Sequence, residues 1–366
     1  MSSLLKNRQR PKILFVCRKQ FGYSIDNYFH CKYLRRYFDI TYISPDVGWE
    51  RVFLEGVLTE YVEFKKNKIL NNLDFYLKIV LSIKKRAFEL IYLNRSFFFF
   101  IFKILNPSKI FIYDIRSGII TLSSLKRYFK TSLIKLDLFF YKNVTVISDN
   151  LAKQLGIKNY HLLPLGAEEF NLPARNFNDI KLVYVGSFNN RNIEDTIEGF
   201  GLFLKDIEDP PKISYHIYGF GNLESEKKIH NAITGKGLQN FVFFHGKILH
   251  KDLPLILAKY NVGVSYIPIT LYFDAQPPTK TFEYLLAGMP VIATRTIENE
   301  KIINEANGVL IQDNPEAFKD GLNNICRKIA ANHFNSDKII RNCLPYSWEN
   351  IVVGNFKPYL ESLLVN

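Results

Sequence analysis

Cysteine, methionine and tryptophan are scarce in this chain of 366 residues, which contains four, two and two of them. The cysteines stand far apart, at positions 17, 31, 326 and 343, so no two of them have metal-binding spacing. A disulfide framework is not expected from so few thiols in a chain of this size. The histidines show no ligand spacing either. We therefore expect free thiols in a reducing compartment and no bound metal.

Long apolar runs are also missing. The longest, Phe97–Phe102, is extended only by Ile104 and Leu105 and is far shorter than the ~20 residues that cross a bilayer. We interpret it as a helix buried against a sheet, with a membrane-dipping face as the alternative. The first residues, MSSLLKNRQRPK, are basic but lack the apolar core and cleavage site of a secretory signal. We therefore expect a cytoplasmic protein without a transmembrane helix.

The net charge of +13 is distributed unevenly. Residues 1–170 contain 28 Lys and Arg against 14 Asp and Glu, whereas the remainder contains 20 against 21. The basic excess thus lies in the first half, which indicates an anionic partner such as phospholipid headgroups, a lipid-linked diphosphate or nucleic acid. No nucleic-acid-binding motif accompanies these charges, so we expect no nucleic acid partner.

Apolar runs alternate with helical stretches along the whole chain. KILFVC (12–17), DITYIS (39–44) and NVTVIS (143–148) are unbroken runs of the kind buried in parallel sheets. After a polar stretch at 167–179 the alternation restarts with KLVYVGS (181–187). The pattern predicts an α/β protein with two Rossmann-like, doubly wound parallel-sheet domains. We expect these domains at 1–170 and 180–345, with a last helix within 346–366 that crosses back to the first.

The most informative segment is QPPTKTFEYLLAGMPVIAT, residues 276–294. We expect a helix to begin near Lys280, after the turn that contains two prolines. Free N–H groups at a helix start, reinforced by the helix dipole, can hold a diphosphate, and Lys280 adds a point charge. Glu283 lies one turn further along the same helix. Its carboxylate can accept hydrogen bonds from two ribose hydroxyls.

This segment resembles the signature of retaining glycosyltransferase family 4, in which a Pro/Gly-rich loop precedes a helix with Glu and then A-x-G-x-P-V-I-A. LVYVGSFNNRN, YHIYGFGNLE and VFFHGKILHKDLPLILAKYNVGVSYIP resemble further family motifs in the same order. The likeness covers roughly 181–315, and ILFVC, VTVIS and HLLPLGAEEF extend it loosely into the first half. It implies the GT-B fold, with two Rossmann-like domains facing a cleft.

The resemblance also implies what each domain does. Residues 1–170 would bind the acceptor and residues 180–345 a UDP- or GDP-sugar, as in a hexosyltransferase. A glycan or lipid-linked acceptor, a role in surface polysaccharide biosynthesis and retention of the anomeric configuration are implied in the same way. No Asp-x-Asp stands at a strand end, so we expect metal independence, with Arg191, Lys280 and helix N-termini acting on the diphosphate.

Individual residues receive roles by the same resemblance. Arg191 stands near the basic position that binds the diphosphate, and Glu283 matches the second Glu of a pair spaced eight apart. Lys247 and Ile248 would flank the base through their backbone. The residues expected to line the donor site are Gly22, Ser187, Gly219, Gly221, Lys247, Ile248, Asp274, Gln276 and Thr279.

Two positions depart from the family pattern. Ala275 stands where the family has the first Glu of the pair, which holds the donor sugar, and Asp274 and Gln276 are the candidates to replace it. The loop RKQFGYS, whose one glycine is Gly22, replaces a glycine-rich G-G-x-E loop.

The expected catalytic residues are Asp114, Arg191, Lys280 and Glu283. Asp114 lies in YDIRSG, at the end of a central strand, and would contact the acceptor hydroxyl or the donor sugar. An inverting enzyme needs a base there. A retaining enzyme can instead rely on the leaving diphosphate and the cations around it. The alternative for Asp114 is a structural pair with Arg116.

Two basic stretches, 65–86 and 126–142, are candidates for an anionic membrane surface at the inner face of the cytoplasmic membrane. Their cations sit beside Leu, Ile, Phe and Tyr, as in interfacial amphipathic helices. These cations are Lys84, Lys85, Arg86, Lys126, Arg127 and Lys130. The alternative is a solvated helix face. For the whole protein, the other interpretations are a degenerate transferase that binds a polyanion or a membrane, and a sugar-nucleotide epimerase of the same fold.

Overall fold

The structure is a computed structural model that describes residues 10–64, 67–119, 123–170, 172–208 and 211–365. The chain divides into two compact units. The first comprises residues 1–165 and 348–366, and the second comprises residues 166–347. Each unit is built around its own parallel sheet.

The first unit contains a parallel sheet in the order β3-β2-β1-β4-β5-β6-β7. The strands are β1 (Lys12–Val16), β2 (Asp39–Asp46), β3 (Val57–Glu63), β4 (Leu90–Asn94), β5 (Ile110–Ile115), β6 (Asn143–Val146) and β7 (His161–Leu162). Strand β3 pairs along its full length with β2, from Val57 opposite Ile40 to Glu63 opposite Asp46. The sequence pattern did not predict it, because β3 is an edge strand in which only Val57 and Val62 are buried.

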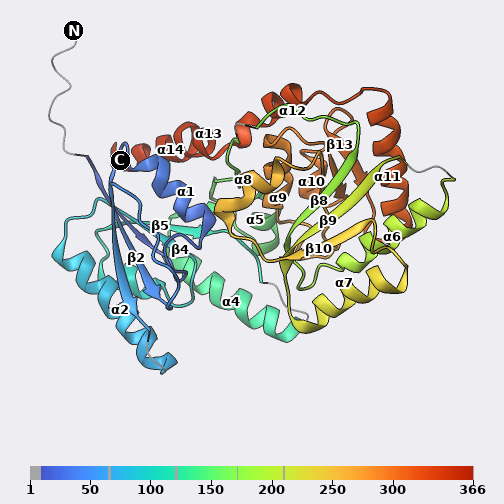
Figure 1. Cartoon of the computed structure of the whole chain (residues 1–366). Coiled ribbons are helices and arrows are strands. Elements are labelled where there is room, and N and C mark those ends of the chain that lie inside the picture. The colour runs from blue at the N-terminus through green and yellow to red at the C-terminus, as the bar shows by residue number, and fades with distance from the viewer. Residues whose placement is uncertain (1–9, 65–66, 120–122, 171, 209–210, 366) are drawn as a thin grey trace, which may run out of the picture. The chain divides into compact units, whose positions relative to one another are not determined.

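Helices cover both faces of this sheet (Figure 1). They are α1 (Ile25–Leu34), α2 (Lys68–Lys85), α3 (Phe100–Leu105), α4 (Ser124–Phe140) and α5 (Asp149–Leu155). From β1 the chain winds towards β2 through α1, and from β3 onward it winds the other way through α2, α3 and α4. Because such crossovers are right-handed, α2, α3 and α4 lie on the face opposite α1.

The end of the chain packs on the α1 side of the first unit. It forms α13 (Trp348–Ile351), a π-helical turn (Val352–Phe356) and α14 (Lys357–Val365). The Trp348 ring stacks on Phe29 of α1 with their centres 5.5 Å apart. Phe356 and Leu360 are fully buried. Figure 1 shows these last helices beside α1.

The second unit contains a six-stranded parallel sheet in the order β10-β9-β8-β11-β12-β13. Its strands are β8 (Ile180–Ser187), β9 (Ile213–Phe220), β10 (Val242–Gly246), β11 (Val262–Ser265), β12 (Val291–Thr294) and β13 (Gly308–Ile311). Its helices are α6 (Ile193–Lys205), α7 (Leu223–Gly235), α8 (Leu253–Leu257), α9 (Thr279–Leu286), α10 (Ile297–Glu300), α11 (Pro315–Ala330) and α12 (Ser336–Cys343). The prediction of two doubly wound parallel sheets is confirmed.

Side-chain caps explain where several helices begin. Asn222 accepts from the Ser225 N–H at the start of α7, and Asn314 accepts from the Ala317 N–H at the start of α11. Asn192, which precedes α6, differs from them. Its φ is 49°, in the left-handed region, and its side chain makes no capping hydrogen bond.

The polar segment 167–179 lies at the start of the second unit. Ala167 forms an isolated parallel bridge with Ser347. Arg175 donates to the carbonyl oxygens of Ala287, Leu257 and Tyr260, at distances of 2.6 to 3.1 Å. Ala167 and Arg175 therefore fasten this segment to the rest of the second unit.

The four cysteines are free thiols, and three of them are buried. Burial raises the pKa of Cys326 and Cys343 to about 12, which makes them unreactive as nucleophiles. No helix in the described part of the chain has the length and apolar character that a bilayer crossing requires.

Candidate functional site

The carboxyl ends of β8 and β11 form the point in the second sheet where the winding reverses. From β8 the chain proceeds to β9 and β10 on one side, and from β11 to β12 and β13 on the other. Ligands of open α/β sheets bind at such a switch point. Arg191 follows β8, and α9, which carries Lys280 and Glu283, follows β11. The topology thus brings three of the four expected catalytic residues to this edge.

The ammonium group of Lys280 is buried and has no hydrogen-bond partner among the described residues. Its nitrogen lies over the Tyr184 ring, 3.7 Å from the ring centre. Burial lowers the pKa of Lys280 well below its usual value, and the nearby positive charge of Arg191 lowers it further. Glu283 acts in the opposite direction but less strongly. The ring provides a cation–π contact, which does not replace a counter-ion.

Arg191 is held in a similar way. Its guanidinium carbon lies 3.7 Å from the centre of the Phe273 ring, and its Nη1 is buried without a hydrogen-bond partner in the described structure. Burial also lowers the pKa of Arg191. The backbone fixes the loop, because the Arg191 N–H donates to the Phe188 carbonyl over 3.1 Å.

Lys280 and Arg191 together form a buried pair of like charges. Isolated buried charges are costly, and each of these cations repels the other. A bound anion would offset that cost by accepting hydrogen bonds from both. The arrangement is therefore suited to a ligand with at least two negative charges, such as a diphosphate.

Helix α9 begins at this pair, with Thr279 as its first residue. Its N-cap residue, Pro278, makes no side-chain capping bond, so no capping side chain occupies the first N–H groups of the helix. The Thr281 hydroxyl anchors the helix to its neighbours. This group bonds to Ser265 at the end of β11 over 2.7 Å and to Asn299 over 3.0 Å. A rigid helix start beside two cations reinforces the preference for an anion.

Glu283 lies one turn along α9, with its side chain 12% exposed. His250 Nε2 is 3.5 Å from its Oε1 atom. The carboxylate is thus partly accessible, and it is close enough to Lys280 to interact with its charge. It is positioned to accept hydrogen bonds from neighbouring hydroxyls of a ligand.

Gly219 allows a close approach of backbone beside this site. It pairs with Gly186 across β8 and β9, and a Cβ atom at Gly219 would stand 1.8 Å from the Gly186 oxygen. Gly221 is also confined, since a Cβ there would lie 3.0 Å from Phe188. Its N–H donates to Glu226 over 3.1 Å. Ser187 ends β8 and its hydroxyl accepts from the Asn189 N–H over 3.3 Å.

The other expected donor-site residues have more varied surroundings. Asp274 accepts the Ile297 N–H over 2.8 Å and so supports the start of α10. The Gln276 amide donates to the Tyr272 carbonyl, within its own turn. Lys247 is exposed after β10, with its ammonium 5.3 Å from the Phe220 ring centre, and Ile248 is half-buried. Two candidates for the missing Glu are thus already engaged in local structure.

Three contributors were not identified from the sequence: Tyr184, Phe273 and His250. Tyr184 and Phe273 hold the two cations, and His250 contacts Glu283. Tyr184 lies on β8 two residues before Gly186, where the alternation of a strand turns both towards the same face. That spacing was the only available signal. Phe273 and His250 lie in irregular or short elements without periodicity.

Asp114 lies in the first unit and is fully buried at the end of β5. Thr145 donates to its Oδ1 over 2.7 Å, Asn94 donates to its Oδ2 over 3.2 Å, and Arg116 Nη1 is 3.9 Å from Oδ1. Burial raises the pKa of Asp114. As placed, Asp114 offers no exposed atom to a substrate. The structure therefore favours the alternative, a structural pair with Arg116.

Gly22 follows β1 in the first unit. Its φ is +90°, and a Cβ there would stand 2.4 Å from the Val52 side chain. The glycine is therefore needed for the turn itself.

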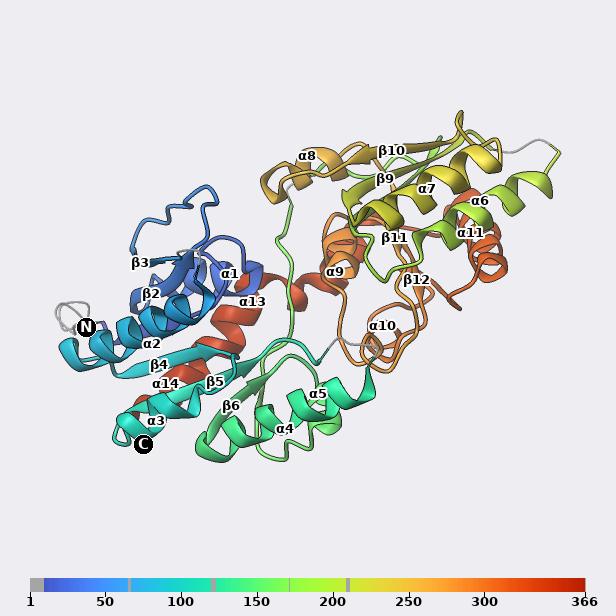
Figure 2. The same ribbon diagram turned by 90° about the horizontal axis from the view of Figure 1, so that it is seen from below.

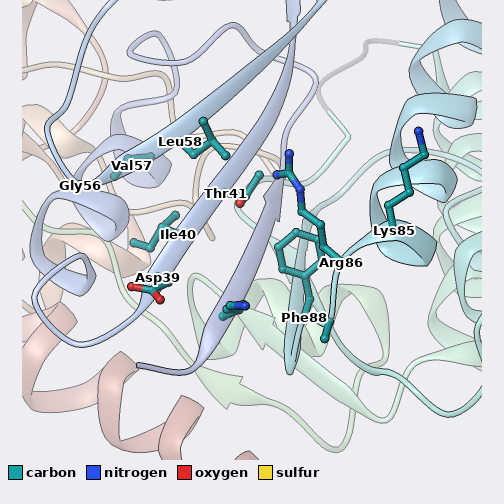
Figure 3. A pocket seen from close by; sticks show the side chains of 11 residues that line it. Asp39, Ile40, Thr41, Gly56, Val57, Leu58, Lys85, Arg86 and Phe88 are labelled. Atoms are coloured by element: carbon teal, nitrogen blue, oxygen red, sulfur yellow. The ribbon is translucent and has the colours of Figure 1, made fainter. Parts of the chain in front are cut away.

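A pocket of about 660 Å³ opens in the first unit (Figure 3). It is lined by the starts of β1, β2 and β3, including Asp39 and Val57, and by the end of α2, including Lys85 and Arg86. This is the amino-terminal edge of the parallel strands, opposite the edge where such sheets bind ligands. Arg86 is already paired with Glu60 over 2.5 Å. We do not assign this pocket to catalysis.

Within the described ranges, no three His, Cys, Asp or Glu side chains are grouped so that they could hold a metal ion. Metal independence stays a prediction.

Residues 179–328 match the family model described as glycosyl transferases group 1. No curated protein matches the sequence.

Among solved structures, a sucrose-phosphate synthase from Thermosynechococcus elongatus is 15% identical with a TM-score of 0.73, and the match covers 98% of this chain and 100% of that one. HepE from Anabaena, in complex with UDP and glucose, is 16% identical with a TM-score of 0.72 over 96% and 100% of the chains. The lipopolysaccharide outer core galactosyltransferase WaaB is 13% identical with a TM-score of 0.68 over 96% and 99%.

The family match falls on the second sheet, around the switch point described above, and the structural matches extend the GT-B fold over nearly the whole chain. The predicted resemblance is confirmed in the second half of the chain, where residues 179–328 match the glycosyl transferases group 1 model.

Proposed function

We propose that this glycosyltransferase uses a UDP- or GDP-sugar as donor and holds its diphosphate at Arg191, Lys280 and the start of α9. The observation that carries the proposal is the pair of cations at the switch point, in which Lys280 Nζ and Arg191 Nη1 are buried without a hydrogen-bond partner in the described part of the chain. Further support comes from Glu283, whose partly accessible carboxylate lies one turn along α9, and we propose that it accepts hydrogen bonds from the ribose hydroxyls. HepE, a structure of the same fold, was solved with UDP and glucose.

In this proposal the two cations and the α9 dipole also act in the chemical step. The bond from the anomeric carbon to the diphosphate oxygen breaks, and negative charge grows on the leaving diphosphate. Preorganised cations in a buried site stabilise that charge more strongly in the transition state than in the ground state. Transfer would proceed with retention and without a metal ion. The oxygen of the acceptor hydroxyl would form the new bond to the anomeric carbon, and the leaving diphosphate would accept the proton of that hydroxyl.

The acceptor in this proposal is a glycan, carried on a lipid, in the assembly of a surface polysaccharide. Support comes from the basic excess of residues 1–170, which suits a lipid-linked diphosphate. A lipopolysaccharide galactosyltransferase shares the fold. Asp114 has no place in this step, because it is buried and already bonded.

The test is nucleotide release from a panel of UDP- and GDP-sugars, with and without a lipid extract. The proposal expects nucleotide release from one donor, and the extract should stimulate it. NMR should show that the new glycosidic bond has the same anomeric configuration, axial or equatorial, as the donor. Absence of release from every donor would contradict it. A protein stabilised by heparin but by no nucleotide would instead be a degenerate transferase that binds polyanions.

A further inference from the structure

Helices α2, α3 and α4 form one layer on the first sheet, and Figure 2 shows them together on one side. Ring contacts place α3 between the other two. The ring centres of Tyr76 of α2 and Phe102 of α3 are 5.2 Å apart. Phe100 of α3 stacks on Phe140 of α4, with the ring centres 5.1 Å apart. The inner side of the layer packs on the strands through Phe75, Phe102 and Ile134, each fully buried.

The outer side of α2 carries a second apolar row. Leu70, Leu73, Leu77 and Leu81 are 41 to 62% exposed and recur at helical spacing. Buried residues such as Asn71, Phe75 and Ile79 occupy the opposite side of the same helix. A helix that only covers a sheet needs one apolar stripe, whereas α2 has two.

Helix α4 repeats this design. The residues Leu125, Tyr128, Phe129, Leu136 and Phe139 are 43 to 83% exposed and follow one face of the helix. On α3, Ile101, Ile104 and Leu105 are exposed as well. The outer surface of all three helices is therefore apolar, well beyond the scattered apolar residues of an ordinary surface.

Cations border these rows. Across the three helices the sequence has nine Lys and Arg against two acids, Asp74 and Asp137. Asp137 is buried and accepts the Phe100 N–H over 2.8 Å, so it does not reach the outer surface. Lys84, Lys85, Lys126 and Lys130 are exposed. Long lysine side chains beside apolar rows can reach anionic headgroups while the rows enter the acyl boundary.

We propose that the outer face of α2, α3 and α4 binds an anionic lipid bilayer interface. We call it the α2–α4 face. Charge complementarity selects this occupant over an uncharged apolar partner, since anionic headgroups can pair with the exposed lysines. The proposal extends beyond the transfer reaction, because it concerns a surface of the first unit and does not depend on nucleotide binding.

Flotation of the full chain with lipid vesicles tests the α2–α4 face, without nucleotide. We expect binding to vesicles of equal parts phosphatidylglycerol and phosphatidylcholine, and weaker binding to phosphatidylcholine alone or at high salt. The variant Leu73→Ser, Leu77→Ser, Phe129→Ser, Phe139→Ser should bind at least about tenfold less. These side chains are exposed, so the variant should fold, which its circular dichroism spectrum verifies.

The matched control is Leu223→Ser with Leu255→Ser, two leucines of the second unit that are 77% and 70% exposed. This control, and Lys280→Met, should bind vesicles like the wild type, which separates the lipid face from the donor site. The proposal is overturned if the wild type does not bind anionic vesicles, or if the fourfold variant binds as well as the control. A wild-type dimer that the fourfold variant abolishes would assign the face to a second copy instead.

Discussion

The ammonium nitrogen of Lys280 lies 3.7 Å from the centre of the Tyr184 ring and has no hydrogen-bond partner among the described residues. Burial and Arg191 both disfavour its charge. A cation buried in this way lowers the free energy of unfolding of the ligand-free protein. In the proposed function, a bound diphosphate offsets this cost.

Replacing Lys280 with methionine should stabilise the free protein. Methionine fills similar space without a charge, so unfolding should cost about 1–3 kcal/mol more at neutral pH. Thermal unfolding would show this as a Tm higher by roughly 2–4 °C for each kcal/mol. Lys236→Met, at an exposed position, is the control and should leave Tm nearly unchanged. A clear drop in Tm for Lys280→Met would mean that the lysine has a stabilising partner within the protein.

Glu283 should recognise ribose hydroxyls. We expect Glu283→Gln to weaken binding of UDP or GDP about tenfold, since hydrogen bonds to a charged group contribute about 1.5–3 kcal/mol. The same change should matter little for a 2′,3′-dideoxynucleoside diphosphate, which lacks both hydroxyls. Competition binding measures the two ratios, with the exposed Glu224→Gln as control. Equal losses for both ligands would exclude the ribose assignment.

Gly219 should tolerate no side chain. A Cβ would meet the Gly186 carbonyl at 1.8 Å, and neither strand can move without breaking its pairing. We expect Gly219→Ala to destabilise the protein by about 3 kcal/mol. Gly235→Ala is the counterpart, because nothing lies within 4 Å of its Cβ position at the end of α7, and it should be neutral or stabilising. Urea unfolding compares them, and similar stabilities would refute the close approach.

Asp137 should make stability depend on pH. Burial raises the pKa of its carboxyl to about 6. The folded state therefore keeps the proton while the unfolded state loses it at lower pH, so this contribution to stability is present near pH 4 and is lost as the pH rises to about 6. The loss is at most about 3 kcal/mol. Asp137→Asn should remove it, because the amide oxygen still accepts the Phe100 N–H. If the free energy of unfolding changed equally in the two proteins from about pH 4 to 7, the assignment would be contradicted.

Much of the fold could be predicted because the sequences of buried parallel strands are unbroken apolar runs. β1, β8 and β12 are of this kind. The sequence pattern did not predict the edge strand β3 or the short helices α5, α10 and α12. These elements bury few residues or are too short for a helical period to show.

The candidate site was predictable where local sequence carries the chemistry. Lys280 and Glu283 share one helix, and Arg191 follows a recognisable strand. The aromatic supports could not be predicted, because Tyr184 and Phe273 meet the cations only through tertiary packing. Asp114 shows the opposite limit: its position at a strand end suggested chemistry, but Thr145, Asn94 and Arg116 arrive from elsewhere in the chain and enclose it.

The most direct measurement is calorimetric titration of UDP and of GDP into the wild-type protein and into Lys280→Met. The account predicts that one of the two nucleotides binds the wild type and that Lys280→Met binds it at least about tenfold more weakly, although this variant is at least as stable as the wild type when free. Equal affinity in both proteins, or binding of neither nucleotide to the wild type, would contradict a diphosphate site at Arg191, Lys280 and the start of α9.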